Sequence, residues 1–285
     1  MTATSAIWLA PAKLNLFLHI TGRRDDGYHE LQTVFQLLDF ADELTISDDR
    51  SGALSLHLQS DSPITSMPMD HNLILRAAEA LRSHVDQPNL GARIDIRKRI
   101  PAGAGLGGGS SDAASTLLAL NQLWKLQLPS AELASLGLAL GADVPVFLQG
   151  RSAWAEGIGE HLQPIELPFR HFLVVTPACE VSTSEIFQHE ELTRNTSAIK
   201  IADFLGGRAR NDCESITRKL YSEVDEALNW LNQHAPARMT GTGSSIFASF
   251  EDLASAQTVL EKLPKGMRGF VAAGLNSLEH RSSAT

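Results

Sequence analysis

The sequence predicts an α+β protein built from two domains. Strands are indicated by twofold alternation of apolar and polar residues at 7–20, 31–47, 53–59 and 92–100. Helices are indicated by apolar residues at helical spacing at 73–84, 110–124 and 130–140. After Gly150 and the glycines at 157 and 159 the pattern begins again. We therefore expect domains at 1–155 and 156–285, with a boundary near residue 155.

Length and composition limit the class of protein. A chain of 285 residues can form one large domain or two ordinary ones. Its 43% apolar and 20% charged residues are typical of a globular protein. The net charge of −9 lacks the basic footprint of a nucleic-acid-binding protein. A phosphate-rich ligand would therefore be held by local donors and not by an overall positive field.

Neither a targeting signal nor a disulfide framework is indicated. Residues 1–6 have no basic or apolar signal region, and the longest apolar stretch, near 136–148, is interrupted by Asp143 and Pro145. We expect a cytoplasmic protein that binds no membrane. Cys179 and Cys213 are too few for a disulfide framework and lack metal-ligand spacing, so we expect reduced, structural thiols.

Local signals order the remaining elements. Residues 70–72 are Asp-His-Asn, cap-type residues before the helix at 73–84. The segment 192–207 is polar and irregular, and we expect it to be a mobile surface region. In the second half we expect strands at 172–175, 245–250 and 270–272 and helices at 213–233 and 253–263.

A glycine-rich run lies between the strand at 92–100 and the helix at 110–124. Five of the seven residues from Gly103 to Gly109 are glycine. Glycine accepts positive φ and lets the backbone approach a ligand closely. A glycine-rich turn before a helix exposes N–H groups and the positive end of the helix dipole, which suits phosphate. A bend that only packs a helix needs fewer glycines. The run therefore predicts a site for nucleotide phosphates.

Three better-known phosphate loops fit this run less well. The spacing Gly103-x-Gly105-x-x-Gly108 matches the dinucleotide fingerprint, but the preceding strand alternates and carries charge, whereas a Rossmann strand is apolar throughout. A P-loop requires lysine where Gly109 stands. The protein-kinase loop requires valine where Ser110 stands, and no His-Arg-Asp motif follows.

Two charged residues lie in apolar surroundings. Asp143 has apolar neighbours on both sides, and an unpaired buried carboxylate is strongly unfavourable. Strand alternation puts Lys13 and Asn15 on one face with Phe17 and His19, opposite a face made of leucines 14, 16 and 18. A Lys13–Asp143 ion pair beside the glycine run would satisfy both groups. A helix-capping aspartate and an edge-strand lysine are the alternatives.

Three weaker features have ordinary structural explanations as well. The loop at 240–245, Thr-Gly-Thr-Gly-Ser-Ser, is either a tight turn or a ligand loop. Tyr28 and His29 follow an Asp-Asp-Gly turn and would often be surface residues. Phe187, taken alone, is most simply a core residue.

Taken together, these segments resemble a known family. Pro-Ala-Lys-Leu-Asn-Leu at 11–16, the glycine run at 101–111 and the loop at 240–245 resemble the three motifs of the GHMP small-molecule kinases. The resemblance covers residues 8–274. The segments at 22–31, 141–145 and 210–214 resemble the branch that acts on a cytidine-diphosphate sugar alcohol in isoprenoid precursor synthesis.

This resemblance implies a fold and an activity. The fold would be an N-terminal nucleotide-binding α/β domain and a C-terminal ferredoxin-like α+β domain. The activity would be ATP-dependent phosphorylation of a substrate hydroxyl, with Mg²⁺ accompanying ATP. The resemblance assigns no metal ligand, although Ser111 is a candidate. The expected partner is the small-molecule substrate, and we expect a monomer or a weak homodimer.

The resemblance also implies roles for individual residues. Asp143 would orient the substrate hydroxyl and take its proton late in a loose transition state, and Lys13 would offset charge on the transferring phosphoryl group. Tyr28 and Phe187 would sandwich the cytosine, and His29 would bond to its edge. Asn15, Gly241 and Thr242 would lie near the substrate. The nucleotide would contact Asn72, Lys98, Pro101, Ala102, Gly103, Ala104, Gly105, Leu106, Gly107, Gly108, Gly109, Ser110 and Ser111.

Two alternatives follow from the same residues. Another GHMP kinase, acting on homoserine, galactose or mevalonate, would have no need of the Tyr28-His29 segment. A non-catalytic sensor with this fold would bind nucleotide but would have no requirement for both Lys13 and Asp143.

Overall fold

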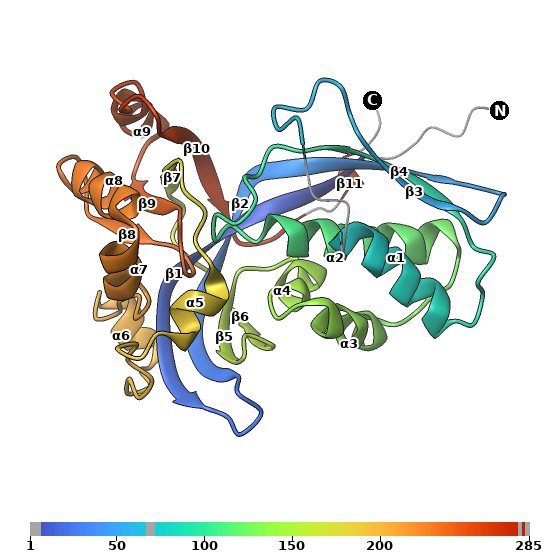
Figure 1. Cartoon of the computed structure of the whole chain (residues 1–285), viewed down its shortest axis with the longest axis horizontal. Helices are drawn as coiled ribbons and strands as arrows, with labels where there is room; N and C mark the ends of the chain where they lie inside the picture. Colours follow the sequence, from blue (N-terminus) through green and yellow to red (C-terminus); the bar gives the residue numbers. More distant parts are fainter. Residues whose placement is uncertain (1–6, 67–71, 279–280, 283–285) are drawn as a thin grey trace.

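A long β-hairpin runs through the molecule and joins its two lobes (Figure 1). The computed structural model describes residues 7–66, 72–278 and 281–282. The hairpin consists of β1 (Ile7–Arg23) and β2 (His29–Asp48), which pair antiparallel. The chain reverses at Gly27, whose φ of 90° favours glycine, and the Tyr28 N–H donates to Asp26 Oδ1 across the turn.

The N-terminal lobe packs helices against one side of the sheet that β2 organises. β4 pairs antiparallel with the second half of β2, β5 pairs antiparallel with its first half, and β3 lies parallel to β4. Figure 1 shows the four helices gathered on one side of these strands. The remaining elements of this lobe are β3 (Leu54–Leu58), α1 (Leu73–His84), β4 (Ala92–Arg97), α2 (Gly108–Leu123), α3 (Ser130–Leu140), α4 (Val144–Gln149), β5 (Ala153–Gly157), β6 (His161–Pro164) and β11 (Arg281–Ser282).

The C-terminal lobe has the ferredoxin-like order of elements. Its strands lie in the order β10-β7-β9-β8, all antiparallel, with α7 and α8 between β7 and β8 and α9 between β9 and β10. Strand β10 also pairs with β2, so both lobes share one sheet. The elements are β7 (His171–Thr176), α5 (Thr183–Gln188), α6 (Ile201–Leu205), α7 (Glu214–Leu220), α8 (Ser222–Asn232), β8 (Ala237–Met239), β9 (Ile246–Phe250), α9 (Leu253–Leu260) and β10 (Arg268–Leu275).

The hydrophobic core continues across the two lobes. One cluster lies between the N-terminal helices and their sheet, and a second fills the C-terminal lobe. The second cluster includes Leu18 and Ile20 of β1, so the end of the hairpin is core for the C-terminal lobe. A third cluster joins Leu14 to Phe172 and Val174 beneath the glycine run. Residue 155 lies within β5, and the domain boundary expected there remains a prediction.

The structure differs from the expected elements in several respects, and it also contains elements that the sequence did not predict: α4, β5, β6, α5, α6, β8 and β11. Strand β1 has register irregularities, one of them between Asn15 and Leu18, and it is buried on both faces: Phe17 and Leu18 enter different core clusters. The helix expected at 213–233 is divided at Tyr221, which has extended backbone. The polar segment 192–207 is anchored: Leu192 is buried, and the Thr196 N–H donates to the Ile20 carbonyl.

The helix predicted at 73–84 is confirmed. Asn72 caps α1, whose bounds match the predicted helix, while Asp70 and His71 lie outside the described residues. Both cysteines are free thiols, and burial raises the pKa of Cys213 to about 12. Within the described part of the chain, no helix has the length and apolar content needed to cross a membrane.

Candidate active site

The glycine run forms the approach to an uncapped helix. Gly103, Gly105 and Gly107 all have positive φ, at 62°, 72° and 71°. Gly107 stands at the N-cap of α2, where no side chain caps the helix and no acidic residue occupies the first turn. The first N–H groups of a helix have no partner within it, so this end of α2 can bind an anion.

The second glycine loop packs directly on the first. A Cβ at Gly105 would lie 2.5 Å from the Thr240 carbonyl oxygen and 2.9 Å from that of Gly243. The Ser245 N–H donates to the Ala104 carbonyl over 3.2 Å, and the Thr240 hydroxyl donates to the Gly105 carbonyl over 3.2 Å. Glycine at 105 is therefore required by this close approach. The 240–245 loop therefore packs against the glycine run, and its role as a ligand loop remains a prediction.

Lys13 and Asp143 form the ion pair that the sequence suggested. The Lys13 Nζ lies 3.3 Å from Asp143 Oδ2, and Lys13 is almost completely buried. Lys13 also donates to Asn15 Oδ1 at 2.5 Å and to the Gly105 carbonyl at 3.1 Å. Asp143 stands directly before α4, and about one third of its side chain is exposed, at 34%. A fixed ammonium thus holds a carboxylate that solvent or a ligand can reach.

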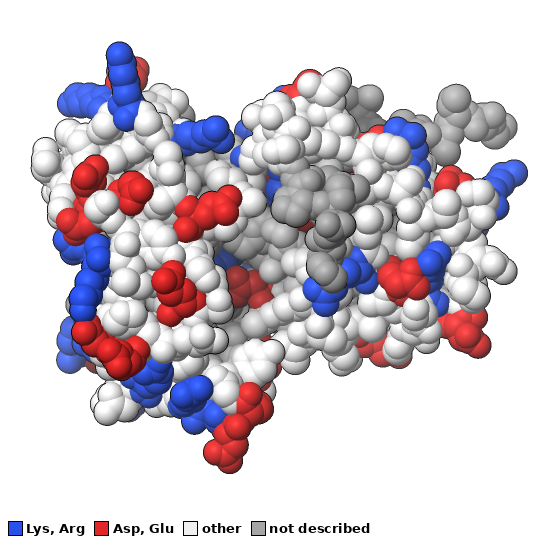
Figure 2. Space-filling view, viewed as in Figure 1, with Lys and Arg blue, Asp and Glu red and all other residues white. Residues whose placement is uncertain are grey.

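Two cavities meet beside this pair. The larger, about 720 Å³, is lined by Lys13 and Asp143. The smaller, about 360 Å³, is lined by the glycine run and the start of α2. Both cavities include Gly105, Gly107 and Ser110, so a ligand in the smaller one can end beside the carboxylate that faces the larger. In Figure 2 the surface is hollowed between the two lobes.

Most of the remaining predicted residues line one of these cavities. The larger cavity is also lined by Asn15, Tyr28, His29, Phe187, Gly241 and Thr242. The smaller is lined by every predicted residue of the loop from Pro101 to Ser110, together with Asn72 and Lys98. Ser111 is fully buried and lines neither cavity, and its hydroxyl has no hydrogen-bond partner among the described residues.

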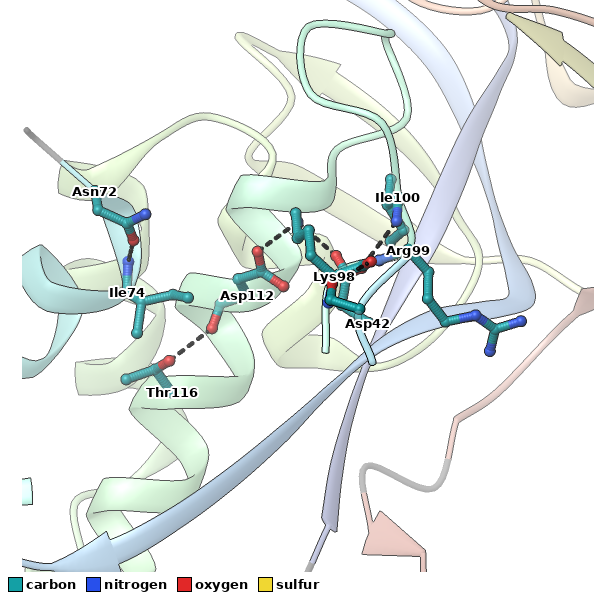
Figure 3. Close-up of polar contacts among 9 residues, drawn as sticks. Asp42, Asn72, Ile74, Lys98, Arg99, Ile100, Asp112 and Thr116 are labelled. Carbon is teal, nitrogen blue, oxygen red and sulfur yellow. Dashed lines mark hydrogen bonds and ion pairs between the residues drawn. The ribbon is translucent and has the colours of Figure 1, made fainter. Parts of the chain in front are cut away.

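Behind the smaller cavity, Lys98 lies between two buried carboxylates (Figure 3). Its Nζ is 2.5 Å from Asp42 Oδ2 and 2.6 Å from Asp112 Oδ2. The other oxygen of Asp42 accepts the N–H groups of Arg99 and Ile100, which lead into the glycine run. The cluster therefore fixes the end of β4 against α2. Sequence reasoning missed both aspartates.

The charges in this cluster are unequal in number. Burial alone would lower the pKa of Lys98, but Asp112 and Asp42 outweigh it and raise that pKa. Burial raises the pKa of Asp112 to about 7; Lys98 opposes this shift and Asp42 adds to it. The ammonium of Lys98 is already paired with two carboxylates. Lys98 therefore does not present a free positive charge to the cavity.

The aromatic residues of the larger cavity lie close together. The rings of His29 and Phe187 are stacked, with centroids 5.1 Å apart and planes inclined by 25°. Tyr28 is 59% exposed at the edge of the same cavity. Arg194 donates to His29 Nε2 over 3.1 Å and to the Phe187 carbonyl over 2.9 Å. Arg194 was not among the predicted residues.

Comparison with known proteins agrees with this geometry. The family descriptions "GHMP kinases N terminal domain" and "GHMP kinases C terminal" match residues 72–151 and 190–269. A 4-diphosphocytidyl-2-C-methyl-D-erythritol kinase of Nitrosococcus oceani is 53% identical over 270 residues, 95% of each chain. The chain belongs to the GHMP kinases. A Vibrio cholerae kinase of the same name is 50% identical over 273 residues, 95% of this chain and 92% of that one.

Solved structures place the chain within the GHMP kinases more narrowly. A crystal structure of 4-(cytidine 5'-diphospho)-2C-methyl-D-erythritol kinase aligns with a TM-score of 0.78 at 35% identity, covering 94% of this chain and 98% of the other. A mevalonate kinase aligns with a TM-score of 0.69 at 18% identity, covering 95% and 99%, which shows the fold alone. This GHMP kinase is therefore a small-molecule kinase with ATP as co-substrate, and the predicted two-domain fold is confirmed.

Oxygen-bearing side chains at the start of α2 would fit the Mg²⁺ that the sequence resemblance implies. Ser110 lines both cavities, and Asp112 lines the smaller one. Asp112 Oδ1 is buried and has no hydrogen-bond partner among the described residues. Mg²⁺ takes oxygen ligands and is usually held by one or two carboxylates together with substrate phosphates. Among the described residues, no group of three or more His, Cys, Asp and Glu side chains could hold a metal without such phosphates.

Proposed function

We propose that this GHMP kinase transfers the γ-phosphoryl group of ATP to the 2-hydroxyl of 4-diphosphocytidyl-2-C-methyl-D-erythritol. The observation that carries the proposal is the Lys13–Asp143 pair, with its 3.3 Å separation, in the larger cavity beside the glycines that this cavity shares with the smaller one. The names of its relatives, at up to 54% identity over nearly the full chain, support the choice of substrate.

The smaller cavity would bind the nucleotide. Its glycine run offers backbone N–H groups, and the uncapped start of α2 adds the positive end of a helix dipole. The overall charge of −9 makes such local donors necessary. The cluster of Asp42, Lys98 and Asp112 would hold the run in shape from behind, and Asn72 would lie beside the nucleotide at the start of α1.

Asp143 would accept the proton of the substrate hydroxyl. A carboxylate is too weak a base to remove that proton early, but a loose transition state requires only that the hydroxyl be oriented and its proton taken late. Hydrogen bonds to Asn15 Oδ1 and to the Gly105 carbonyl would hold Lys13 in position, and its ammonium would offset negative charge on the phosphoryl group during transfer. Bound Mg²⁺, held by phosphates with Ser110 and Asp112, would neutralise phosphate charge.

The larger cavity would bind the acceptor. Tyr28 and Phe187 would contact the two faces of the cytosine, with His29 at its edge. Because Phe187 stacks on His29 in this structure, one of these rings would shift to admit the base. Asn15, Gly241 and Thr242 would position the sugar-alcohol part near Asp143. The monomer or weak homodimer and the cytoplasmic location expected from the sequence remain predictions.

A coupled assay for ADP release tests this function. The purified protein, ATP and Mg²⁺ should turn over 4-diphosphocytidyl-2-C-methyl-D-erythritol and leave homoserine, mevalonate and galactose unphosphorylated. Turnover of one of those three in place of the cytidine substrate would instead make the chain another GHMP kinase. ATP binding with no turnover on any of them would favour a sensor. A Tyr28→Ala variant should mainly raise KM for the cytidine substrate, because it removes one stacking surface.

A further inference from the structure

Arg194 connects the two sides of the larger cavity. Its Nε donates to His29 Nε2 over 3.1 Å at the start of β2. Its terminal nitrogens donate to the carbonyls of Phe187, His189 and Leu192 over 2.9, 2.7 and 3.2 Å. One guanidinium thus fixes the chain after α5 to the tip of the β1–β2 hairpin. Through Arg194, the segment 192–207 therefore holds two sides of the larger cavity together.

The bond to His29 determines where the imidazole carries its proton. A guanidinium has only N–H donors and stays protonated, so His29 Nε2 must supply a lone pair. A neutral imidazole has one donor and one acceptor nitrogen, and the proton of His29 therefore lies on Nδ1. No described residue makes a hydrogen bond to that nitrogen in the structure. His29 lines the larger cavity, and its Nδ1–H group would be the donor left for a ligand there.

The surroundings of His29 keep the ring neutral. Burial lowers the pKa of His29, and the positive charges of Arg194 and Arg23 lower it further. Two acidic residues close to His29 in the sequence, Asp26 and Glu30, both pair with Arg24, at 3.2 and 3.8 Å. Two positive charges from different segments thus disfavour the protonated form of His29. Asp26 and Glu30 are already paired with Arg24.

We infer that Arg194 is a positioning residue for base specificity: it holds His29 as the Nδ1–H tautomer, which presents a single donor to the N3 atom of a pyrimidine. This inference rests on the proposed function. N3 of cytosine is an acceptor, whereas N3 of uracil carries a proton. The His29 Nδ1–H group, fixed by Arg194, can therefore donate a hydrogen bond to N3 of cytosine. Opposite uracil it would face the N3–H group, and both donors would be left without a hydrogen bond.

The tautomer can be measured without any turnover. Two-bond ¹H–¹⁵N NMR spectra of the uniformly labelled protein distinguish Nδ1–H from Nε2–H imidazoles. The His29 signals are assigned as those missing from His29→Gln. We expect the Nδ1–H form in the unmodified protein and a shift toward Nε2–H in Arg194→Met. An Nε2–H ring in the unmodified protein would overturn the inference and leave the proposed function standing.

Kinetics then test the link to specificity. Arg194→Met should raise KM for the cytidine substrate about tenfold and leave KM for ATP within about twofold. The preference for the cytidine substrate over its uridine counterpart, about a hundredfold in the unmodified protein, should fall at least tenfold, because the freed ring can adopt either tautomer. An unchanged preference in a folded Arg194→Met variant would also overturn the inference.

The chain offers a matched control directly after the same segment. Arg208 has a 75% exposed side chain and pairs with Asp203. Arg208→Met should leave the His29 tautomer, both KM values and the base preference unchanged. If the unmodified protein phosphorylates no cytidine substrate, the proposed function fails while the NMR result on His29 still decides whether Arg194 fixes the tautomer.

Discussion

At the scale of single residues, Asp112 is almost completely buried, and its Oδ1 has no hydrogen-bond partner among the residues that the structure describes. Burial raises the pKa of this carboxyl to about 7, with Lys98 opposing and Asp42 reinforcing the shift. An aspartate in an unfolded chain titrates near pH ~4. Between these values the folded protein retains a proton that the unfolded chain has lost, so Asp112 makes folding less favourable as pH rises through this window.

Replacing Asp112 should therefore alter the pH dependence of stability. We expect the free energy of unfolding to fall less steeply between pH 4.5 and 7 in Asp112→Asn than in the unmodified protein. One proton can account for a slope of at most ~1.4 kcal/mol per pH unit. Urea titrations with EDTA and without nucleotide measure this. Asp61→Asn, at an exposed carboxylate that pairs with Arg97, is the control. Identical slopes for Asp112→Asn and the unmodified protein would contradict the assignment.

A second residue-scale prediction concerns Asp143. Asp143→Asn keeps the size of the side chain but removes the proton acceptor, so kcat should fall at least about a hundredfold. KM for ATP should change little, because Asp143 lines only the larger cavity. Steady-state kinetics check both values, with Asp61→Asn again as the control. Near-normal turnover would remove Asp143 from the chemistry.

The single residues also show what the sequence could reveal. Lys13 and Asp143 were predictable because each is a charge in an apolar segment, and such a charge needs a partner. Arg194 was not, because it lies in a polar segment where arginine is ordinary and its partner His29 is 165 positions away. Asp42 and Asp112 were missed for a similar reason: their common partner, Lys98, comes from a third element.

At the scale of elements, the longer strands and helices with clear periodicity were predicted, whereas short elements such as β5, β6 and β8 were not. The helix at 73–84 was predicted to the residue. The division between α7 and α8 at Tyr221 has no glycine or proline to mark it. No residue pattern marks the irregular register of β1 near Asn15 either. This irregularity lies next to Lys13 and Asn15, which are hydrogen-bonded to each other at the site. Tertiary packing decides such features.

The contact between the two glycine loops leads to an element-scale prediction. Gly105→Ala would place a Cβ 2.5 Å from the Thr240 carbonyl oxygen, so the loops must separate. We expect KM for ATP to rise at least about tenfold and stability to fall by about 1–3 kcal/mol. Gly103→Ala is a matched control: φ is also positive, at 62°, but no atom lies within 4 Å of the added Cβ. It should cost stability without comparable loss of ATP affinity.

Equal effects of these two substitutions would show that backbone strain alone matters. Calorimetric titration with a non-hydrolysable ATP analogue and thermal unfolding of both variants separate the two contributions. A Gly105→Ala protein that binds the analogue normally would mean that the 240–245 loop does not hold the glycine run in its binding conformation.

At the scale of the whole molecule, the hairpin makes the lobes depend on each other. Leu18 and Ile20 of β1 belong to the core of the C-terminal lobe, and the Asp212 carboxylate accepts the N–H of Ile20 over 2.9 Å. β2 pairs with strands of both lobes. Neither lobe can retain its full core once the hairpin is lost. We therefore expect both lobes to unfold in one cooperative step.

Native-state hydrogen exchange in rising urea tests this cooperativity. The slowest amides of α2 and of β7, one element from each lobe, should converge on the same free energy of unfolding. A difference of more than about 2 kcal/mol between them would mean that one lobe opens while the other stays folded. Residues 156–285 expressed alone should remain unfolded, because they lack Leu18 and Ile20 and the backbone partners that β1 supplies. Adding residues 1–155 as a separate chain should restore their exchange protection.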